Sequence, residues 1–162
     1  MAISLPASVE TVVAADEARC FLHIVPIDLA GIFTGYGPLP AVTGTRGQSG
    51  GWDAAGQTRT VLLSDGSTAQ ERLTGYRHPD YFSYTVGGFS GSLRFLAASA
   101  QGEWWFEPVP SAAATRIRWR YAFTARSVWV APLLWFIATV LWRGYMRKAL
   151  RLVKAQLEAG AA

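Results

Sequence analysis

The sequence predicts an α+β fold in which an antiparallel sheet of about six to seven strands packs against one long C-terminal helix. Residues 115–124 alternate strictly, with Ile117, Trp119 and Tyr121 on one face and three arginines on the other, as in a half-buried strand. The long helical stretch follows directly and carries no charged residue from Ser127 to Trp142. A sheet with one apolar face needs a cover, and this helix is long enough to provide it.

The N-terminal part predicts one strand and two short helices. Residues 8–14 are rich in β-branched side chains, which favour a strand. Asp16 is suited to cap a helix over residues 18–25, which a proline then ends. A second short helical segment is expected at about residues 28–34. The glycines and prolines of residues 35–40 prevent a further helical turn and predict a shaped loop.

The middle of the chain predicts strands joined by turns, and the clearest is a hairpin of residues 58–63 and 68–76. Asp-Gly at positions 65 and 66 favours a two-residue turn. That register pairs Glu71 with Thr60, so Glu71 and Arg59 would lie on opposite faces unless a bulge unites them. Because most charged side chains are exposed, we expect both to face water.

Two further strands follow a turn at residues 78–80. Phe82, Tyr84 and Val86 share one face of the first, and residues 103–107 form the second. Residues 89–100 show no periodic pattern, and we assign no structure to them. Pairing the second strand with residues 115–124 is expected to place each outward charge opposite its counterpart, Glu103 against Arg120 and Glu107 against Arg116.

The uncharged stretch before the basic half of the C-terminal helix has two interpretations, a packed helix and a membrane span. Pro132 favours a helix that begins near Ala131. Residues 131–142 then extend roughly 18 Å, against a hydrocarbon core of about 30 Å. We therefore expect this half to be enclosed by the sheet. The second half carries a solvated basic stripe of Arg143, Arg147, Arg151 and Lys154. Its association with a membrane surface stays open.

Composition limits the compartment and the partners. The chain has 162 residues, which suits a single domain. Cys20 is its only cysteine, so an internal disulfide or a cysteine-based zinc site is excluded. The absence of disulfides and a polar N-terminus without a signal-peptide pattern favour a cytoplasmic protein. The net charge of +4 is already reached by residues 143–158, so nucleic-acid binding is not indicated. We expect a monomer or homodimer without cofactor or metal.

Several segments carry a resemblance to a known family: residues 8–10, 35–38, 59–67 with Glu71, 82–84, 102–106 and 118–121. In them the sequence resembles the START/Bet v1-like (SRPBCC) superfamily, and within it the bacterial polyketide cyclase/dehydrase-like proteins. The resemblance implies the helix-grip fold, one domain over residues 1–162 in which a curved sheet surrounds the C-terminal helix with a hydrophobic cavity between them. Members bind lipids, sterols, polyketides or hormones, and some are enzymes.

The chain contains seven Trp, eight Phe and six Tyr, more bulky apolar area than a two-layer core of this size needs. We expect part of it to line a cavity for a hydrophobic small molecule, entered near residues 36–40. The predicted lining residues are Phe33, Tyr36, Trp52, Phe82, Tyr84, Trp104, Phe106, Trp119, Tyr121, Leu134, Ile137 and Leu141.

The candidate catalytic residues are Glu71, Arg59, Tyr84 and Arg94, which are polar residues on or beside strands with many aromatic neighbours. If Glu71 points inward, its pKa would rise and it could act as a general acid or base on a carbonyl compound. Three functions therefore stay open: binding of a hydrophobic ligand, a cyclase or dehydratase reaction, and a membrane-associated interaction through the basic helix and Trp129.

Overall fold

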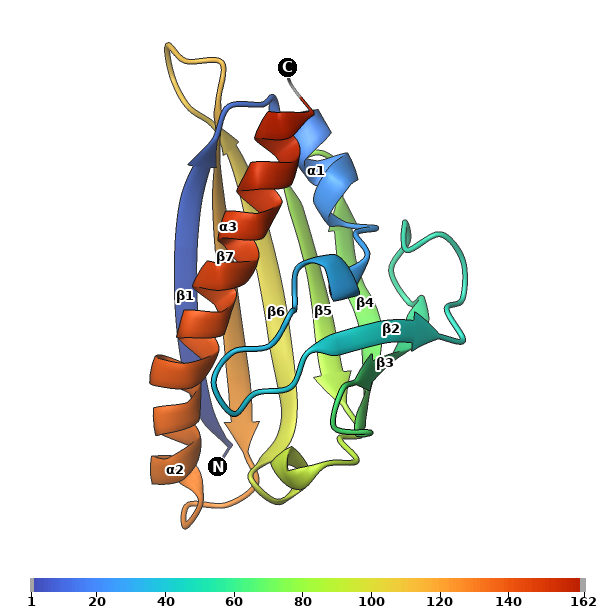
Figure 1. The fold of residues 1–162 in the computed structure, drawn as a ribbon, viewed down its shortest axis with the longest axis vertical. Coiled ribbons are helices and arrows are strands. Elements are labelled where there is room, and N and C mark those ends of the chain that lie inside the picture. Colours follow the sequence, from blue (N-terminus) through green and yellow to red (C-terminus); the bar gives the residue numbers. More distant parts are fainter. Residues whose placement is uncertain (1, 161–162) are drawn as a thin grey trace.

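The computed structural model describes residues 2–160 and shows one sheet with a long helix across its concave face (Figure 1). Strand β1 (Ile3–Val13) is followed by helix α1 (Glu17–Ile24) and a 3₁₀ turn, η1 (Leu29–Gly31). The remaining elements are, in chain order, β2 (Val42–Arg46), β3 (Thr58–Leu63), β4 (Thr68–Arg77), β5 (Tyr81–Gly87), the 3₁₀ turn η2 (Ser92–Phe95), β6 (Ala97–Pro108), β7 (Thr115–Ala125), α2 (Ala131–Phe136), the π-helical segment η3 (Ile137–Trp142) and α3 (Arg143–Ala159).

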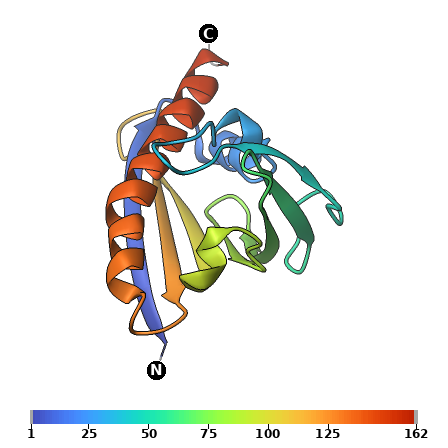
Figure 2. The same ribbon diagram turned by 60° about the horizontal axis from the view of Figure 1, so that its bottom comes forward.

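The seven strands form a single antiparallel sheet in the order β1-β7-β6-β5-β4-β3-β2. Figure 2 shows the sheet curving so that β2 and β3 turn back toward the side on which the long helix lies. The helix packs over β1, and α1 lies beside its C-terminal end (Figure 1). This is the Bet v1-like helix-grip fold, which confirms the predicted fold class.

The predicted N-terminal elements are confirmed, with shifts of a few residues at their ends. Strand β1 begins five residues earlier than expected, because it pairs with β7 along its whole length. The Asp16 side chain caps α1 and accepts a hydrogen bond from the Arg19 backbone N–H at 2.9 Å. The second helical segment is only the short η1 turn.

The predicted pairing of β6 with β7 is confirmed in its register. Glu103 lies opposite Arg120 and Glu107 lies opposite Arg116. The ion pair of Glu107 is diagonal, because its carboxylate accepts from Arg118 at 2.6 Å. The alternating residues of β7 from Thr115 to Phe123 are buried on the concave face, as predicted.

The long helix begins at Ala131 with Pro132 in its first turn, as predicted, and runs through η3 into α3 without a break. It buries one stripe on the sheet, formed by Leu134, Ala138, Tyr145, Met146, Ala149, Leu150, Val153 and Leu157. The expectation that its apolar first half is enclosed is wrong: Leu133, Trp135, Phe136 and Val140 are exposed. The sheet covers a helix from one side only, so the outer face of α2 stays uncovered. Within residues 2–160, no helix combines the length and apolarity needed to cross a membrane.

Candidate functional site

The concave face of the sheet carries its side chains in rows that run across the strands. One row consists of Arg59, Glu71, Val86, Ala100 and Phe123. The next row consists of Leu73, Tyr84, Gly102, Tyr121 and Ala7. A third consists of Tyr76, Phe82, Trp104, Trp119 and Val9. The first two rows therefore combine polar groups with small residues in the middle of the sheet, whereas the third consists of aromatic residues apart from Val9.

The register of the β3–β4 hairpin places Arg59 directly opposite Glu71, which corrects the predicted pairing with Thr60. The Leu63 N–H donates to the Ser67 carbonyl oxygen, which closes a three-residue loop in place of the expected two-residue turn. Gly66 adopts a left-handed φ of +84° at the third loop position, the usual companion of a bulge. The additional loop residue shifts the register by one and brings both charged side chains to the concave face.

Arg59 and Glu71 form a buried ion pair, so the expectation that they face water is wrong. Their exposed fractions are 6% and 9%, and Arg59 Nε donates to Glu71 Oε2 at 2.7 Å. This contact joins the Nε of Arg59 to one oxygen of Glu71. The second oxygen of Glu71 is not engaged in it and can bind a polar group of a ligand.

Trp52 covers the guanidinium of this pair. The Arg59 Cζ atom lies 4.0 Å from the centroid of the indole ring, within the range of a cation–π interaction. Trp52 is buried although it belongs to the loop between β2 and β3, and its φ of +59° is left-handed, which is uncommon for an aromatic residue. The loop conformation therefore holds the ring over Arg59 and excludes water from that side of the ion pair.

Burial raises the pKa of Glu71 above the ordinary value of a glutamate, and the Arg59 guanidinium lowers it without cancelling the effect. The desolvation cost is larger than the attraction because the carboxyl lies in an apolar interior. Protonated Glu71 can donate from one oxygen while the other accepts from Arg59. The pair can thus act as a hydrogen-bond donor, or as a proton donor, toward a polar group on a ligand.

Tyr84 and Tyr121 bring two phenols next to the ion pair, one on each side of Gly102. A Cβ atom at Gly102 would overlap the ring of Tyr84, so the glycine provides the space in which that ring lies. The ring centroids of the two tyrosines are 6.3 Å apart. Burial raises the pKa of both phenols, and the charge of Glu71 contributes further. Both hydroxyls therefore stay protonated at neutral pH.

Aromatic rings fill the interior between these groups and the helix. Trp104 and Trp119 stack with centroids 4.5 Å apart, and Trp142 lies 4.8 Å from Tyr121. The indole Nε1 atoms of Trp119 and Trp142 are buried, and neither has a hydrogen-bond partner within residues 2–160. Buried donors are nearly always paired in folded proteins, so two unpaired ones in one aromatic cluster are unusual.

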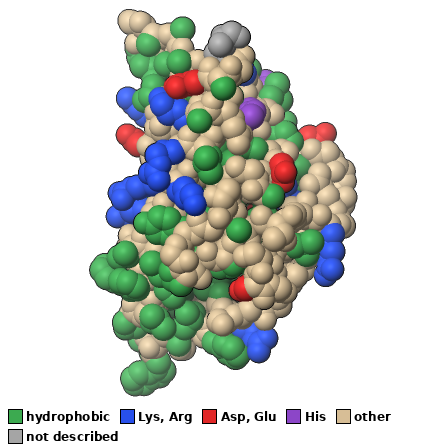
Figure 3. Space-filling view, in the orientation of Figure 1, with side chains coloured by type: hydrophobic (Ala, Val, Ile, Leu, Met, Phe, Trp, Pro, Cys, Tyr) green, Lys and Arg blue, Asp and Glu red, His purple; other side chains and the backbone are tan. Residues whose placement is uncertain are grey.

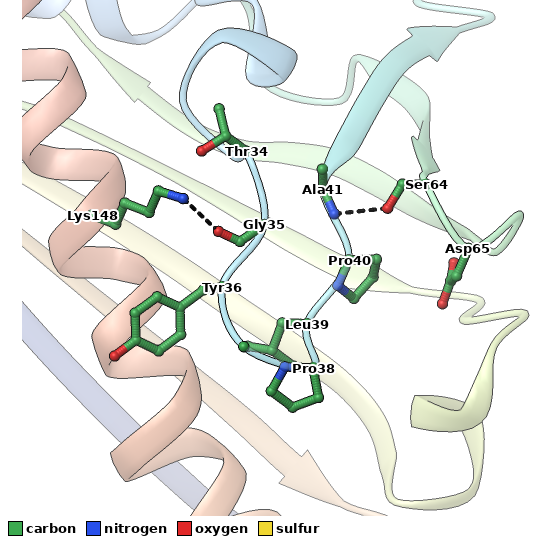
Figure 4. A pocket seen from close by; sticks show the side chains of 11 residues that line it. Thr34, Gly35, Tyr36, Pro38, Leu39, Pro40, Ala41, Ser64, Asp65 and Lys148 are labelled. Atoms are coloured by element: carbon green, nitrogen blue, oxygen red, sulfur yellow. Dashed lines mark hydrogen bonds between the residues drawn. The ribbon is translucent and has the colours of Figure 1, made fainter.

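The loop of residues 34–41 is fastened to the long helix by three hydrogen bonds. The Gly35 N–H donates to the Tyr145 hydroxyl at 2.9 Å, and that hydroxyl donates to the Pro40 carbonyl oxygen at 2.9 Å. Lys148 Nζ donates to the Gly35 carbonyl oxygen at 2.7 Å (Figure 4). Tyr36 lies across the helix beside Gly144, where a Cβ atom would overlap its ring. The loop therefore closes one side of the space between sheet and helix.

An open pocket of about 680 Å³ lies at this loop, lined by residues 34–41 together with Ser64, Asp65 and Lys148 (Figure 4). Its volume is within the range of small-molecule sites. Tyr36 is its only lining residue among the twelve predicted ligand-binding residues. The pocket lies where the opening was expected, near residues 36–40.

The structure brings most of the other predicted residues together in the interior. Phe33, Trp52, Phe82, Tyr84, Trp104, Phe106, Trp119, Tyr121 and Leu134 are buried, and Ile137 and Leu141 are partly buried on the helix. Arg94 lies apart from them: it is exposed on η2 and donates to the Ser90 carbonyl oxygen at 2.9 Å. Within the described residues, no three His, Cys, Asp or Glu side chains are grouped as a metal site would require.

Two contributors to the interior, Trp142 and Gly102, were missed by sequence reasoning. Trp142 and Tyr145 both contact Phe33, with ring centroids 6.0 and 5.4 Å away. The spacing of four residues from Leu134 through Ala138 to Trp142 and Met146 is a signal that could have placed Trp142 on the inner stripe. Gly102 gave no such signal, because its importance depends on the Tyr84 ring across the sheet.

Comparisons with known proteins agree with this architecture. The chain is similar to norcoclaurine synthase from Thalictrum flavum, solved in complex with dopamine and hydroxybenzaldehyde, at 10% identity with a TM-score of 0.69, over 96% of this chain and 87% of that one. It is similar to the ginseng (Panax ginseng) major latex-like protein 151 at 12% identity with a TM-score of 0.67, over 94% and 97% of the two chains. It is also similar to XoxI from Bacillus cereus at 16% identity with a TM-score of 0.65, over 94% of each chain.

These solved structures, at such low identity, support the fold alone. The search of curated proteins gave no match. The sequence profile described as "Polyketide cyclase / dehydrase and lipid transport" matches residues 27–158, which is most of the chain. The protein therefore belongs to the polyketide cyclase/dehydrase and lipid transport family.

Proposed function

We propose that the protein binds a small hydrophobic molecule with one polar group, such as a carbonyl or hydroxyl, between the concave face of the sheet and the long helix. The observation that carries the proposal is the Arg59–Glu71 ion pair, buried on the concave face and joined through Arg59 Nε and Glu71 Oε2. A hydrogen bond from a ligand to the second Glu71 oxygen is stronger in this apolar interior than it would be in water, so a ligand with one polar group gains affinity there.

The surrounding residues suit the apolar part of such a ligand. Val86 and Ala100 lie in the row of the ion pair and carry no ring, so a ligand can lie against the sheet there. The unpaired indole N–H groups of Trp119 and Trp142 offer further donors. Access is proposed beside the loop of residues 34–41, after release of its hydrogen bonds to Tyr145 and Lys148.

Native mass spectrometry of the purified protein tests for a bound molecule, and anilinonaphthalene sulfonate serves as a fluorescent probe with an anionic group. We expect Arg59→Met to weaken probe binding by about tenfold or more, because hydrogen bonds to charged groups contribute about 1.5–3 kcal/mol. Arg72→Met is the matched control, since Arg72 lies next to Glu71 on β4 but is exposed on the other face. Equal binding of the probe by both variants would contradict the proposal. So would the absence of probe binding to the wild-type protein.

A second candidate function, catalysis of a cyclisation or dehydration of a carbonyl compound, is favoured by the raised pKa of Glu71. A carboxyl with a raised pKa can donate a proton to a carbonyl oxygen in its acid form, and can receive one from the adjacent carbon in its ionised form. In that case, Glu71→Gln should retain ligand binding and lose turnover. Retention of both would leave ligand binding as the function.

A further inference from the structure

Six exposed apolar side chains lie together at one end of the molecule, and we call them the apolar tip. They are Val128, Trp129, Leu133, Trp135, Phe136 and Val140. Trp129, in the loop before α2, is 89% exposed, and the other five are 46–62% exposed. In Figure 3, hydrophobic side chains gather over α2 and the loop that precedes it. Exposed apolar clusters of this kind mark interaction surfaces, because water contact with them is unfavourable.

Basic residues border the apolar tip. On α3, Arg147 and Arg151 are exposed within two to three turns of Val140, and Figure 3 shows Lys and Arg side chains directly above the apolar cluster. On the other side, Arg126 Nε donates to the Arg94 carbonyl oxygen at 2.7 Å, which places two more exposed arginines at this end. Residues 108–157 contain nine Lys and Arg and no Asp or Glu.

This charge distribution identifies the kind of partner. In a symmetric contact with a second copy, the tip of one chain would bring its arginines against those of the other, and no carboxylate in residues 108–157 would compensate them. An anionic lipid surface supplies both an apolar layer and a negative charge at its border. Exposed tryptophans are also the side chains that membrane interfaces favour.

The dimensions fit this partner. Val140, in the tip, and Arg147, which is exposed on α3, are seven residues apart, roughly 10 Å along a helix. Apolar faces of interfacial helices enter the boundary between headgroups and acyl chains by about 5–10 Å. When the tip is inserted as far as Val140, Arg147 therefore lies at the level of the lipid phosphates, with Arg151 one turn above it. No spanning helix is needed for this mode of binding.

We propose that the protein docks on anionic membrane surfaces by inserting the apolar tip, with the arginines around it bound to lipid phosphates. The proposal depends on the outer face of α2 and its surroundings, not on the interior ligand site. Membrane docking can therefore be refuted while ligand binding is confirmed, and ligand binding can be refuted while membrane docking is confirmed.

Flotation of the full chain with lipid vesicles tests it, using phosphatidylcholine alone and phosphatidylcholine mixed with phosphatidylglycerol. We expect binding to the mixed vesicles that weakens with added salt. Trp129→Glu and Phe136→Glu should each reduce this binding at least tenfold. Leu22→Glu is the matched control, because Leu22 is 56% exposed on α1, far from the tip in sequence and in the fold.

A charge variant completes the test. Arg147→Gln with Arg151→Gln should reduce binding to the mixed vesicles by about fivefold per charge. Arg72→Gln, an exposed arginine on β4, should leave it unchanged. Circular dichroism confirms that each variant is folded. Absence of binding to mixed vesicles, or binding that the tip variants do not alter, overturns the proposal. It is also overturned if the tip variants change the oligomeric state and not vesicle binding, which would assign the surface to a protein contact.

Discussion

Adding a single methyl group at position 102 should destabilise the protein, although alanine is ordinarily compatible with a strand. In Gly102→Ala, the new Cβ would overlap the Tyr84 ring, which is held between Phe82 and Tyr121 and cannot move freely. Overpacking of a buried site costs about 1–3 kcal/mol. Gly87→Ala is the matched control, because Gly87 lies on the neighbouring strand, where a Cβ would have no neighbouring atom within 4 Å. This control should gain up to about 1 kcal/mol.

Thermal unfolding followed by circular dichroism measures the difference. At about 2–4 °C per kcal/mol for a domain of this size, Gly102→Ala should unfold several degrees below wild type, and Gly87→Ala at or above it. Replacing the Tyr84 ring by a smaller side chain, in Gly102→Ala combined with Tyr84→Leu, should restore part of the lost unfolding temperature, since the two sites are in contact and their effects are not additive. Equal unfolding temperatures for the two glycine variants would refute the placement of Tyr84 over Gly102.

Two further predictions concern the ion pair and the loop. Because burial raises the pKa of Glu71, the folded protein binds the proton of this carboxyl more tightly than the unfolded chain does. The protonated carboxyl therefore contributes to the free energy of unfolding. This contribution is fully present below the ordinary pKa of a glutamate and is lost as the pH rises through the raised pKa. Urea unfolding across pH should therefore show a decline for wild type that is absent in Glu71→Gln, and equal slopes would contradict the assignment. Tyr145→Phe removes two hydrogen bonds from the loop, worth about 1 kcal/mol each, and should speed amide hydrogen exchange in residues 35–41, whereas Tyr36→Phe should not.

The β3–β4 hairpin illustrates where sequence reasoning stopped. Asp65 and Gly66 indicated a turn, and the strands on both sides were predicted within one residue. The turn length was not predictable from them, because Asp-Gly suits both a two-residue turn and the last two positions of a three-residue loop. One residue of register decides the face of every side chain in the strand, so this small error hid the buried pair of Arg59 and Glu71.

The first half of the long helix shows a similar limit. Pro132 correctly indicated its start, and the shortness of the apolar stretch argued against a membrane span; within residues 2–160 the structure has no helix long and apolar enough for one. An uncharged stretch is equally compatible with burial on all sides and with an uncovered apolar face. Only the position of the helix on the sheet shows that Leu134 is covered while Leu133 and Phe136 are not.

The sequence by itself determined the order of the elements and the inward faces of β5, β6 and β7, because periodicity and turn residues act locally along the chain. Its resemblance to known proteins indicated the family. Tertiary structure decided which polar groups meet and what remains exposed. The ion pair depends on the length of the loop between β3 and β4. The space for the Tyr84 ring depends on a glycine of the neighbouring strand, and the exposure of the apolar tip depends on which side of the helix the sheet covers. Each is a relation between distant segments, and such relations are set by packing in three dimensions.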